Sequence, residues 1–129
     1  MKVIDTQGSA NSSPDRLLHG RRILVVEDET LIALTAQDML TDAGADVVIA
    51  TRASEAADHL SGSHQFDGVI IDLNLGDGYD SSLATIAVGR GIPVVFATGY
   101  PRANDLPAVF AATPIVSKPY TGDMLVSAL

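Results

Sequence analysis

The sequence contains no cysteine and no tryptophan, and aromatic residues make up only 5% of its 129 residues. The absence of cysteine excludes a disulfide framework and any metal site held by thiolates. No apolar run approaches the roughly 18 residues that a membrane-spanning helix needs. Residues 1–20 also lack the apolar core of a secretory signal. We therefore expect a cytoplasmic protein that does not act at a membrane.

Basic residues are scarce as well, with 8 lysines and arginines against 16 acids and a formal net charge of −8. Direct binding of nucleic acid needs a basic surface that neutralises phosphates, so we expect none. Lysine is rarer still, since only Lys2 and Lys118 occur. Lys118 is therefore the single lysine of the expected folded region, which makes it a candidate functional residue.

The remaining composition is that of one globular domain, with 47% hydrophobic residues. Residues 1–20 are rich in serine, asparagine, glycine and aspartate without periodicity, which predicts a flexible N-terminal extension. Residues 21–129 are the expected folded domain. In that region, continuous apolar runs alternate with segments of helical spacing.

The apolar runs predict five strands, at 23–27, 46–50, 68–72, 93–97 and 114–117. The segments between and after them predict about five helices, at 30–44, 54–62, near 80–90, weakly at 103–112, and from a Thr121 cap to the end. In the first helix Ile32, Ala36, Met39 and Ala43 are expected to line one face, with Gly44 as the stop. This alternation predicts an α/β fold, a doubly wound parallel sheet covered by helices on both faces.

Polar residues gather where the predicted strands end. Glu27 and Asp28 follow the first strand, Asp72 ends the third, Thr98 follows the fourth and Lys118 follows the fifth. Parallel sheets bind ligands beyond the carboxyl ends of their strands, so these side chains are expected to converge. Clustered carboxylates stay ionised only beside a cation, and oxygen ligands without histidine or cysteine suit Mg²⁺.

This constellation predicts a phosphorylation site centred on Asp72. A carboxylate can act as a nucleophile and take a phosphoryl group as an aspartyl phosphate. Mg²⁺ and Lys118 would neutralise the charge on the transferred oxygens, and the Thr98 hydroxyl would donate a hydrogen bond to one of them.

Four motifs, in order and on the expected strands, make residues 22–129 resemble the receiver domain of two-component response regulators: "ILVVEDE", "VIIDLNL", "VVFATG" and "IVSKPY". The resemblance implies a flavodoxin-like (CheY-like) sheet of five parallel strands in the order 2-1-3-4-5. It also implies that Glu27, Asp28, Asp72 and the backbone carbonyl of Asn74 hold Mg²⁺, and that Asp72 accepts phosphate from a phosphohistidine.

The same resemblance implies roles for residues around the phosphoacceptor. Thr98 and Lys118 are expected to contact the phosphoryl oxygens, and the Lys118–Pro119 peptide bond is expected to be cis. Asn74 and Tyr100 occupy the positions that, in receivers, tune how fast the phosphate is lost.

One position departs from the receiver pattern. Receivers usually carry tyrosine or phenylalanine three residues before the lysine, and this chain has Ile115 there. The loop "FATGYPR" is similar to that of a subgroup of single-domain receivers with a Phe-Ala-Thr-Gly signature that lack the same aromatic residue, although Pro101 replaces the tyrosine of that signature. We therefore expect a stand-alone receiver in which the signal travels through the loop after Thr98.

The leading hypothesis is a signalling protein that catalyses only its own phosphorylation and slow dephosphorylation. Its implied partners are a sensor histidine kinase or histidine phosphotransfer protein and a downstream protein target, and a phosphorylation-dependent dimer stays open. The alternatives are a receiver fragment of a larger regulator and a receiver-like interaction module that is never phosphorylated.

Two other classes fit the sequence less well. A phosphohydrolase of the haloacid-dehalogenase type would carry a second aspartate two residues after the nucleophile, where this chain has Asn74. A flavodoxin-like carrier of FMN would need backbone donors and hydroxyls in its first loop, where this chain has the acidic "EDETL".

Overall fold

The computed structural model describes residues 17–62, 65–73, 82–99, 113–118 and 120–129. Over these residues strands and helices alternate as far as β4, and the order is β1 (Arg22–Val26), α1 (Thr30–Asp42), β2 (Asp46–Ala50), α2 (Ala53–Ser61), β3 (Gly68–Asp72), α3 (Ser82–Gly89), β4 (Val94–Thr98), β5 (Ile115–Ser117) and α4 (Gly122–Ala128). All strand pairs are parallel and the sheet order is β2-β1-β3-β4-β5, which confirms the predicted flavodoxin-like fold. The weakly predicted helix at 103–112 lies outside the described residues.

The interior strands of the sheet are apolar because helices cover both of their faces. Every residue of β3 and β4 is buried. The strand β4 begins and ends one residue later than predicted, since Pro93 stays outside it and Thr98 is its last residue. The Pro93 carbonyl still joins the sheet by accepting the N–H of Val69 at 3.0 Å.

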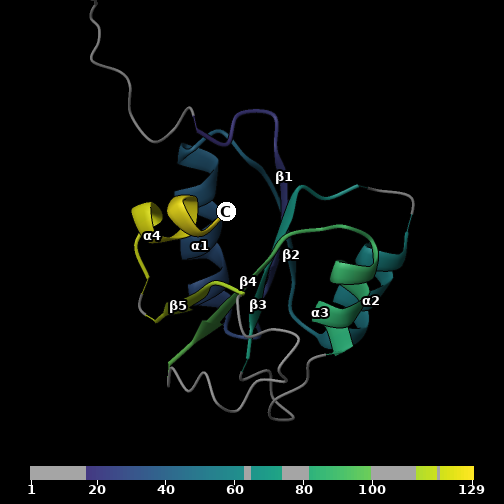
Figure 1. Ribbon diagram of the computed structural model, residues 1–129. Coiled ribbons are helices and arrows are strands. Elements are labelled where there is room, and N and C mark those ends of the chain that lie inside the picture. The colour runs from purple at the N-terminus through teal and green to yellow at the C-terminus, as the bar shows by residue number, and fades with distance from the viewer. Residues whose placement is uncertain (1–16, 63–64, 74–81, 100–112, 119) are drawn as a thin grey trace, which may run out of the picture.

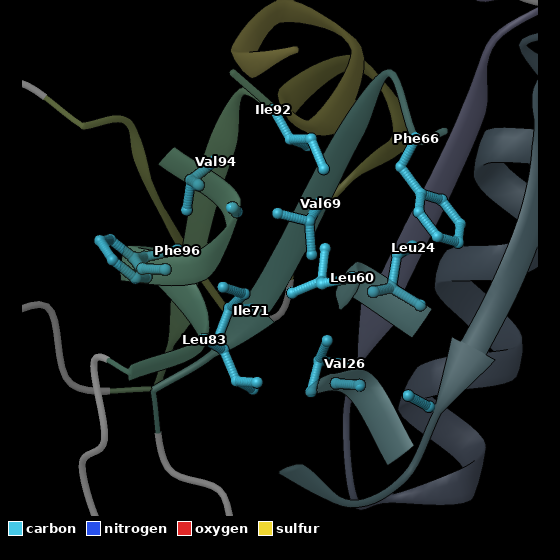
Figure 2. Packing of buried hydrophobic residues seen from close by; sticks show 14 residues of the cluster. Leu24, Val26, Leu60, Phe66, Val69, Ile71, Leu83, Ile92, Val94 and Phe96 are labelled. Atoms are coloured by element: carbon cyan, nitrogen blue, oxygen red, sulfur yellow. The ribbon is translucent and has the colours of Figure 1, made fainter. Parts of the chain in front are cut away.

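The helices form one layer on each side of the sheet. Figure 1 shows α2 and α3 on one side, with α1 and α4 on the other. Between the sheet and the α2–α3 layer lies a core cluster whose larger side chains are shown in Figure 2: Leu24, Val26, Leu60, Phe66, Val69, Ile71, Leu83, Ile92, Val94 and Phe96. The cluster under α1 and α4 includes Leu18, Ile23, Val25, Leu40, Ile70, Val95, Tyr120 and Leu125. Two buried layers thus hold the strand ends in place.

The buried face of α1 differs in part from the predicted one. Ala33, Ala36 and Leu40 are buried in the helix, whereas Ile32 and Met39 are only half-buried. The prediction placed the centre of the face about one residue too early, so Ile32 lies at its border. The helix ends as expected before Gly44, whose φ of 96° is a conformation that only glycine adopts without strain.

The end of the molecule opposite the acidic strand ends is tied together by specific contacts. The Arg90 guanidinium, which follows α3, donates to the carbonyls of Leu60 and Gly62 at 2.7 and 3.2 Å and so caps the end of α2. A Cβ added to Gly68 would lie 2.9 Å from Cδ2 of Leu129, so a side chain here would displace the end of that leucine where it packs on β3. None of the helices in the described ranges is long and apolar enough to span a membrane.

Candidate functional site

The carboxyl ends of the strands bring five of the predicted site residues to one edge of the sheet. Asp72 and Thr98 are the last residues of β3 and β4, and both side chains are buried. Lys118 follows β5, and its backbone N–H donates to the Thr98 carbonyl at 2.8 Å. Glu27 follows β1 and is held by a bond from its N–H to the Ala50 carbonyl at 3.0 Å. The parallel register therefore aligns residues that are far apart in sequence.

The Lys118 ammonium forms ion pairs with two buried carboxylates. Its Nζ lies 2.7 Å from Oε1 of Glu27 and 3.0 Å from Oδ2 of Asp72. The carboxylates are almost inaccessible, with relative side-chain exposures of 2% and 3%. The other oxygen of Glu27, Oε2, accepts the backbone N–H of Glu29 at 3.2 Å. These contacts explain why carboxylates can stand at the ends of apolar strands. A buried charge is tolerated where an opposite charge and hydrogen bonds compensate it.

Burial and mutual repulsion change the proton affinity of these groups. Burial and, to a smaller extent, the neighbouring Asp72 raise the pKa of Glu27, whereas Lys118 lowers it, and the net result is a pKa of about 7. Burial alone would lower the pKa of Lys118, but its contacts with Glu27 and Asp72 outweigh this and hold the pKa above its usual value. The cluster therefore favours a bound cation at this edge of the sheet.

The acidic residues also form a set that suits a divalent metal. Glu27, Asp28 and Asp72 each offer a carboxylate oxygen, and these oxygens lie within 4.8 Å of one another. Two ligands on opposite sides of Mg²⁺ are about 4.2 Å apart, so small shifts of these side chains would let them share one ion. Asp28 is exposed while the other two are buried, which leaves one side of the cluster open to water. All donors are hard oxygens, the type that Mg²⁺ prefers.

Three predicted residues cannot be placed, because Asn74, Tyr100 and Pro119 lie outside the described residues. Ile115, at the position where receivers usually carry an aromatic side chain, is half-buried and pairs in register with Phe96 of β4. It packs against the core cluster under α2 and α3.

One feature of the site was not predicted from the sequence, a pocket between α1 and the segment after β5. It has a volume of about 410 Å³ and is lined by Leu31, Ile32, Thr35, Lys118 and Tyr120. Tyr120 is buried, and burial together with the negative charge of Glu27 raises its pKa to about 12. The signal that could have revealed the pocket is the apolar start of α1, which lies directly after the acidic residues.

Comparisons with known proteins agree with this geometry. Over 81 residues the chain is 40% identical to a protein of Bacillus subtilis named uncharacterized transcriptional regulatory protein YbdJ, and the match covers 61% of this chain and 35% of YbdJ. Over 86 residues it is 33% identical to the transcriptional regulatory protein PdtaR of Mycobacterium tuberculosis, covering 65% of this chain and 42% of PdtaR. The matched part thus spans less than half the length of either relative.

Solved structures show the same fold. The solution structure of SdrG from Sphingomonas melonis Fr1 superposes with a TM-score of 0.71 at 31% identity, over 87% of this chain and 93% of SdrG. The family model of the response regulator receiver domain matches residues 23–129. The alternating fold, the acidic edge and these matches together show that the chain belongs to the response regulator receiver domain family.

Proposed function

We propose that Asp72 accepts a phosphoryl group from a phosphohistidine of a sensor histidine kinase or a histidine phosphotransfer protein, in a reaction that depends on Mg²⁺. The observation that carries this proposal is the position of Asp72: a buried carboxylate at the ligand-binding edge of the sheet, 3.0 Å from the Lys118 ammonium and close to oxygens of Glu27 and Asp28. Receiver domains are signalling phosphoacceptors, and the family binds Mg²⁺ through acidic residues, which supports the same assignment.

The proposed transfer forms a bond between an Asp72 carboxylate oxygen and phosphorus and breaks the bond between phosphorus and the donor imidazole nitrogen. The donor histidine leaves as neutral imidazole once it has taken up a proton. Glu27, Asp28, Asp72 and the Asn74 carbonyl would hold Mg²⁺, which supplies positive charge to the transferred oxygens.

The neighbouring polar residues would bind the phosphoryl group. Lys118 would exchange part of its ion pairing with Glu27 for a phosphoryl oxygen, while the Thr98 hydroxyl donates to another. We further propose a cis peptide bond before Pro119 and control of dephosphorylation by Asn74 and Tyr100. The phosphorylation signal would be transmitted without an aromatic side chain at position 115, where the chain has isoleucine.

The output that we propose is a change in protein–protein contacts, with slow loss of the phosphate by autodephosphorylation. Both curated relatives are named transcriptional regulatory proteins. For this chain we propose a protein target without direct contact to nucleic acid, because acids outnumber bases two to one. We also propose that the protein acts in the cytoplasm, where kinase phosphodonors of this kind are formed.

Incubation with Mg²⁺ and acetyl phosphate, followed by intact-mass measurement, tests this function. We expect a gain of one phosphoryl group that disappears in excess EDTA and in Asp72→Asn. A matched control is Asp46→Asn, which removes an exposed carboxylate at the far end of the sheet and should leave the gain unchanged. A gain that persists in Asp72→Asn would contradict the assignment of the acceptor. If neither acetyl phosphate nor a panel of phosphorylated histidine phosphotransfer proteins adds a phosphoryl group, the result would favour an interaction module that is never phosphorylated.

A further inference from the structure

A second pocket lies at the end of the molecule opposite the acidic strand ends. It has a volume of about 210 Å³ and is lined by Gln65, Phe66, Arg90, Gly91 and Ile92. Phe66 precedes β3 and Ile92 precedes β4, so the pocket lies at the amino ends of these parallel strands. A strand of the length of β3 spans about 15 Å, and Asp72 is at its other end. The pocket is therefore remote from the candidate phosphoacceptor.

The apolar walls of this pocket belong to the core of the protein. Phe66 and Ile92 are buried in the cluster under α2 and α3, and Figure 2 shows both side chains at the same end of that cluster. The Phe66 ring also packs edge to face against the His59 ring of α2, with the ring centroids 6.2 Å apart. Because core packing holds these side chains, the pocket is formed before any ligand binds.

The charged wall of the pocket is the Arg90 side chain. Its Nη1 donates to the carbonyls of Leu60 and Gly62 at 2.7 and 3.2 Å, which fixes the position of the guanidinium. Within the described part of the chain, its Nε and Nη2 form no hydrogen bond and no carboxylate pairs with it. The Gln65 side chain, which is exposed, has no hydrogen-bond partner there either. The pocket thus offers an uncompensated positive charge and unused N–H donors.

These donors fit a carboxylate better than a phosphate. A guanidinium binds a planar carboxylate through two parallel N–H bonds. Phosphate sites usually add several backbone N–H groups, but the N–H groups of Gly91 and Ile92 already donate to carbonyls of α3 at 3.0 and 2.9 Å. The two carbonyls that Arg90 contacts carry partial negative charge, which disfavours a dianion beside them. The pocket therefore favours a ligand with a single negative charge.

We propose that this pocket binds a short-chain carboxylate. The carboxylate accepts two hydrogen bonds from Nε and Nη2 of Arg90, and the Gln65 amide donates a further one. The hydrocarbon chain of the ligand lies against Phe66 and Ile92. Because the volume is below the roughly 300 Å³ at which drug-sized sites begin, the ligand has only a few carbon atoms. The site goes beyond the proposed function, since it uses neither Asp72 nor Mg²⁺ and gives the domain a second input at its opposite end.

Heteronuclear NMR of the isotope-labelled full chain, titrated with sodium butyrate, tests the site. We expect saturable shifts of the backbone amides of Gln65, Gly91 and Ile92, with a Kd of about 1 mM. Sodium chloride at the same ionic strength should not reproduce them. Butyramide has the shape of butyrate without its charge and should bind at least about tenfold more weakly. Sodium phosphate should cause no saturable shift of these amides.

Variants separate the two donors of the pocket. Arg90→Lys keeps the charge but loses the fork of donors, so the Kd for butyrate should rise about tenfold. Gln65→Leu should raise it by a smaller factor. The matched control is Arg52→Lys, which changes an exposed arginine at the start of α2 and should leave the Kd within about twofold. Asp72→Asn should also leave it unchanged, because the site does not depend on phosphorylation.

Urea midpoints report whether each variant keeps its fold. Since Arg90 also holds the end of α2, the exposed Gln65 provides a variant that tests the pocket without loosening that helix. Equal binding of butyramide or phosphate, amide shifts that sodium chloride reproduces, or equal effects of Arg90→Lys and Arg52→Lys would overturn the proposal. So would a Kd that Gln65→Leu and Arg90→Lys both leave unchanged.

Discussion

Lys118 is the residue on which the acidic edge of the sheet depends. Its ammonium lies within 3.0 Å of both Glu27 and Asp72, which β1 and β3 hold in buried positions. Removing one partner of a buried ion pair is costly, because the remaining charge loses its compensation without regaining water. The two carboxylates concentrate negative charge where a metal ion would bind, and Lys118 supplies the positive charge that a phosphoryl group would contact.

Lys118→Met should therefore destabilise the protein strongly in buffer without Mg²⁺. We expect a loss of about 3 kcal/mol in the free energy of unfolding, because two buried carboxylates lose their cation. Urea denaturation measures the change. The control is Arg22→Met, whose exposed ion pair with Asp46 at 3.2 Å should contribute about 0.5 kcal/mol or less. Similar losses for the two variants would show that the buried pairs carry little stability.

Glu27 should make stability depend on pH in a defined window. Burial raises its pKa from 4.5 to about 7, so the folded protein keeps a proton that the unfolded chain releases above pH 4.5. The free energy of unfolding should fall as the pH rises from 4.5 to 7, by up to about 3 kcal/mol from this group.

Urea denaturation of the wild type and Glu27→Gln, in Mg²⁺-free buffer across that window, checks this effect. The amide cannot ionise, so the variant should lose less stability than the wild type as the pH rises. Parallel pH profiles for the two proteins would contradict the raised pKa.

At the level of secondary structure, short strands place the polar residues at one edge of the sheet. The helices that pack on both faces hold these strands in position. Most elements could be predicted, because β-branched runs such as 68–72 and 46–50 are distinct from the helical spacing between them. The predicted ends of β1 and β4 were each off by one residue: β1 ends before Glu27 and β4 includes Thr98. Hydrophobic periodicity does not show at which residue the pairing of strands stops.

The last helix begins with a cap that the sequence predicted. The Thr121 hydroxyl accepts the Met124 N–H at 3.2 Å, at the start of a helix of only seven residues. Thr121→Ala should cost about 1 kcal/mol because that N–H loses its acceptor. Thr121→Ser keeps the hydroxyl and should cost less than half as much. Thermal unfolding measures the stability lost by each variant. Equal losses would show that the hydrogen bond from the Met124 N–H to the Thr121 hydroxyl does not stabilise the helix.

Some features of the site could not be predicted from sequence. The strand-end rule brought Glu27, Asp72 and Lys118 together correctly, because parallel strands share one edge. The pocket beside Tyr120 depends on how the chain after β5 packs on α1, which sequence spacing does not reveal. The predicted domain boundary at residue 21 remains a prediction, and we note that Leu18 is buried and its N–H donates to the Ala43 carbonyl at 2.8 Å.

For the whole molecule, the charge balance is the dominant electrostatic feature. A net charge of −8 opposes the compact state through self-repulsion, and part of that charge converges on one edge of the sheet. Salt screens the general repulsion, whereas a divalent cation bound at the acidic edge would neutralise the local excess. The two effects can be told apart by experiment.

Millimolar MgCl₂ should raise the Tm more than NaCl at the same ionic strength, because an ion that binds only the folded state stabilises it. The extra rise should vanish in Asp28→Asn, which removes one carboxylate of the cluster. Glu29→Gln, an exposed neighbour outside the cluster, is the matched control and should keep the rise. Equal effects of the two salts on the wild type would contradict a specific Mg²⁺ site.

The position of the phosphoryl group is the first thing to measure. The protein would be phosphorylated with acetyl phosphate and Mg²⁺, reduced with borohydride, which converts an aspartyl phosphate to homoserine, and mapped by peptide mass spectrometry. We predict homoserine at position 72 and at no other acid, with none in Asp72→Asn. Homoserine at Asp28, or an unmodified Asp72 in a protein that has gained a phosphoryl group, would show that the buried carboxylate beside Lys118 is not the acceptor.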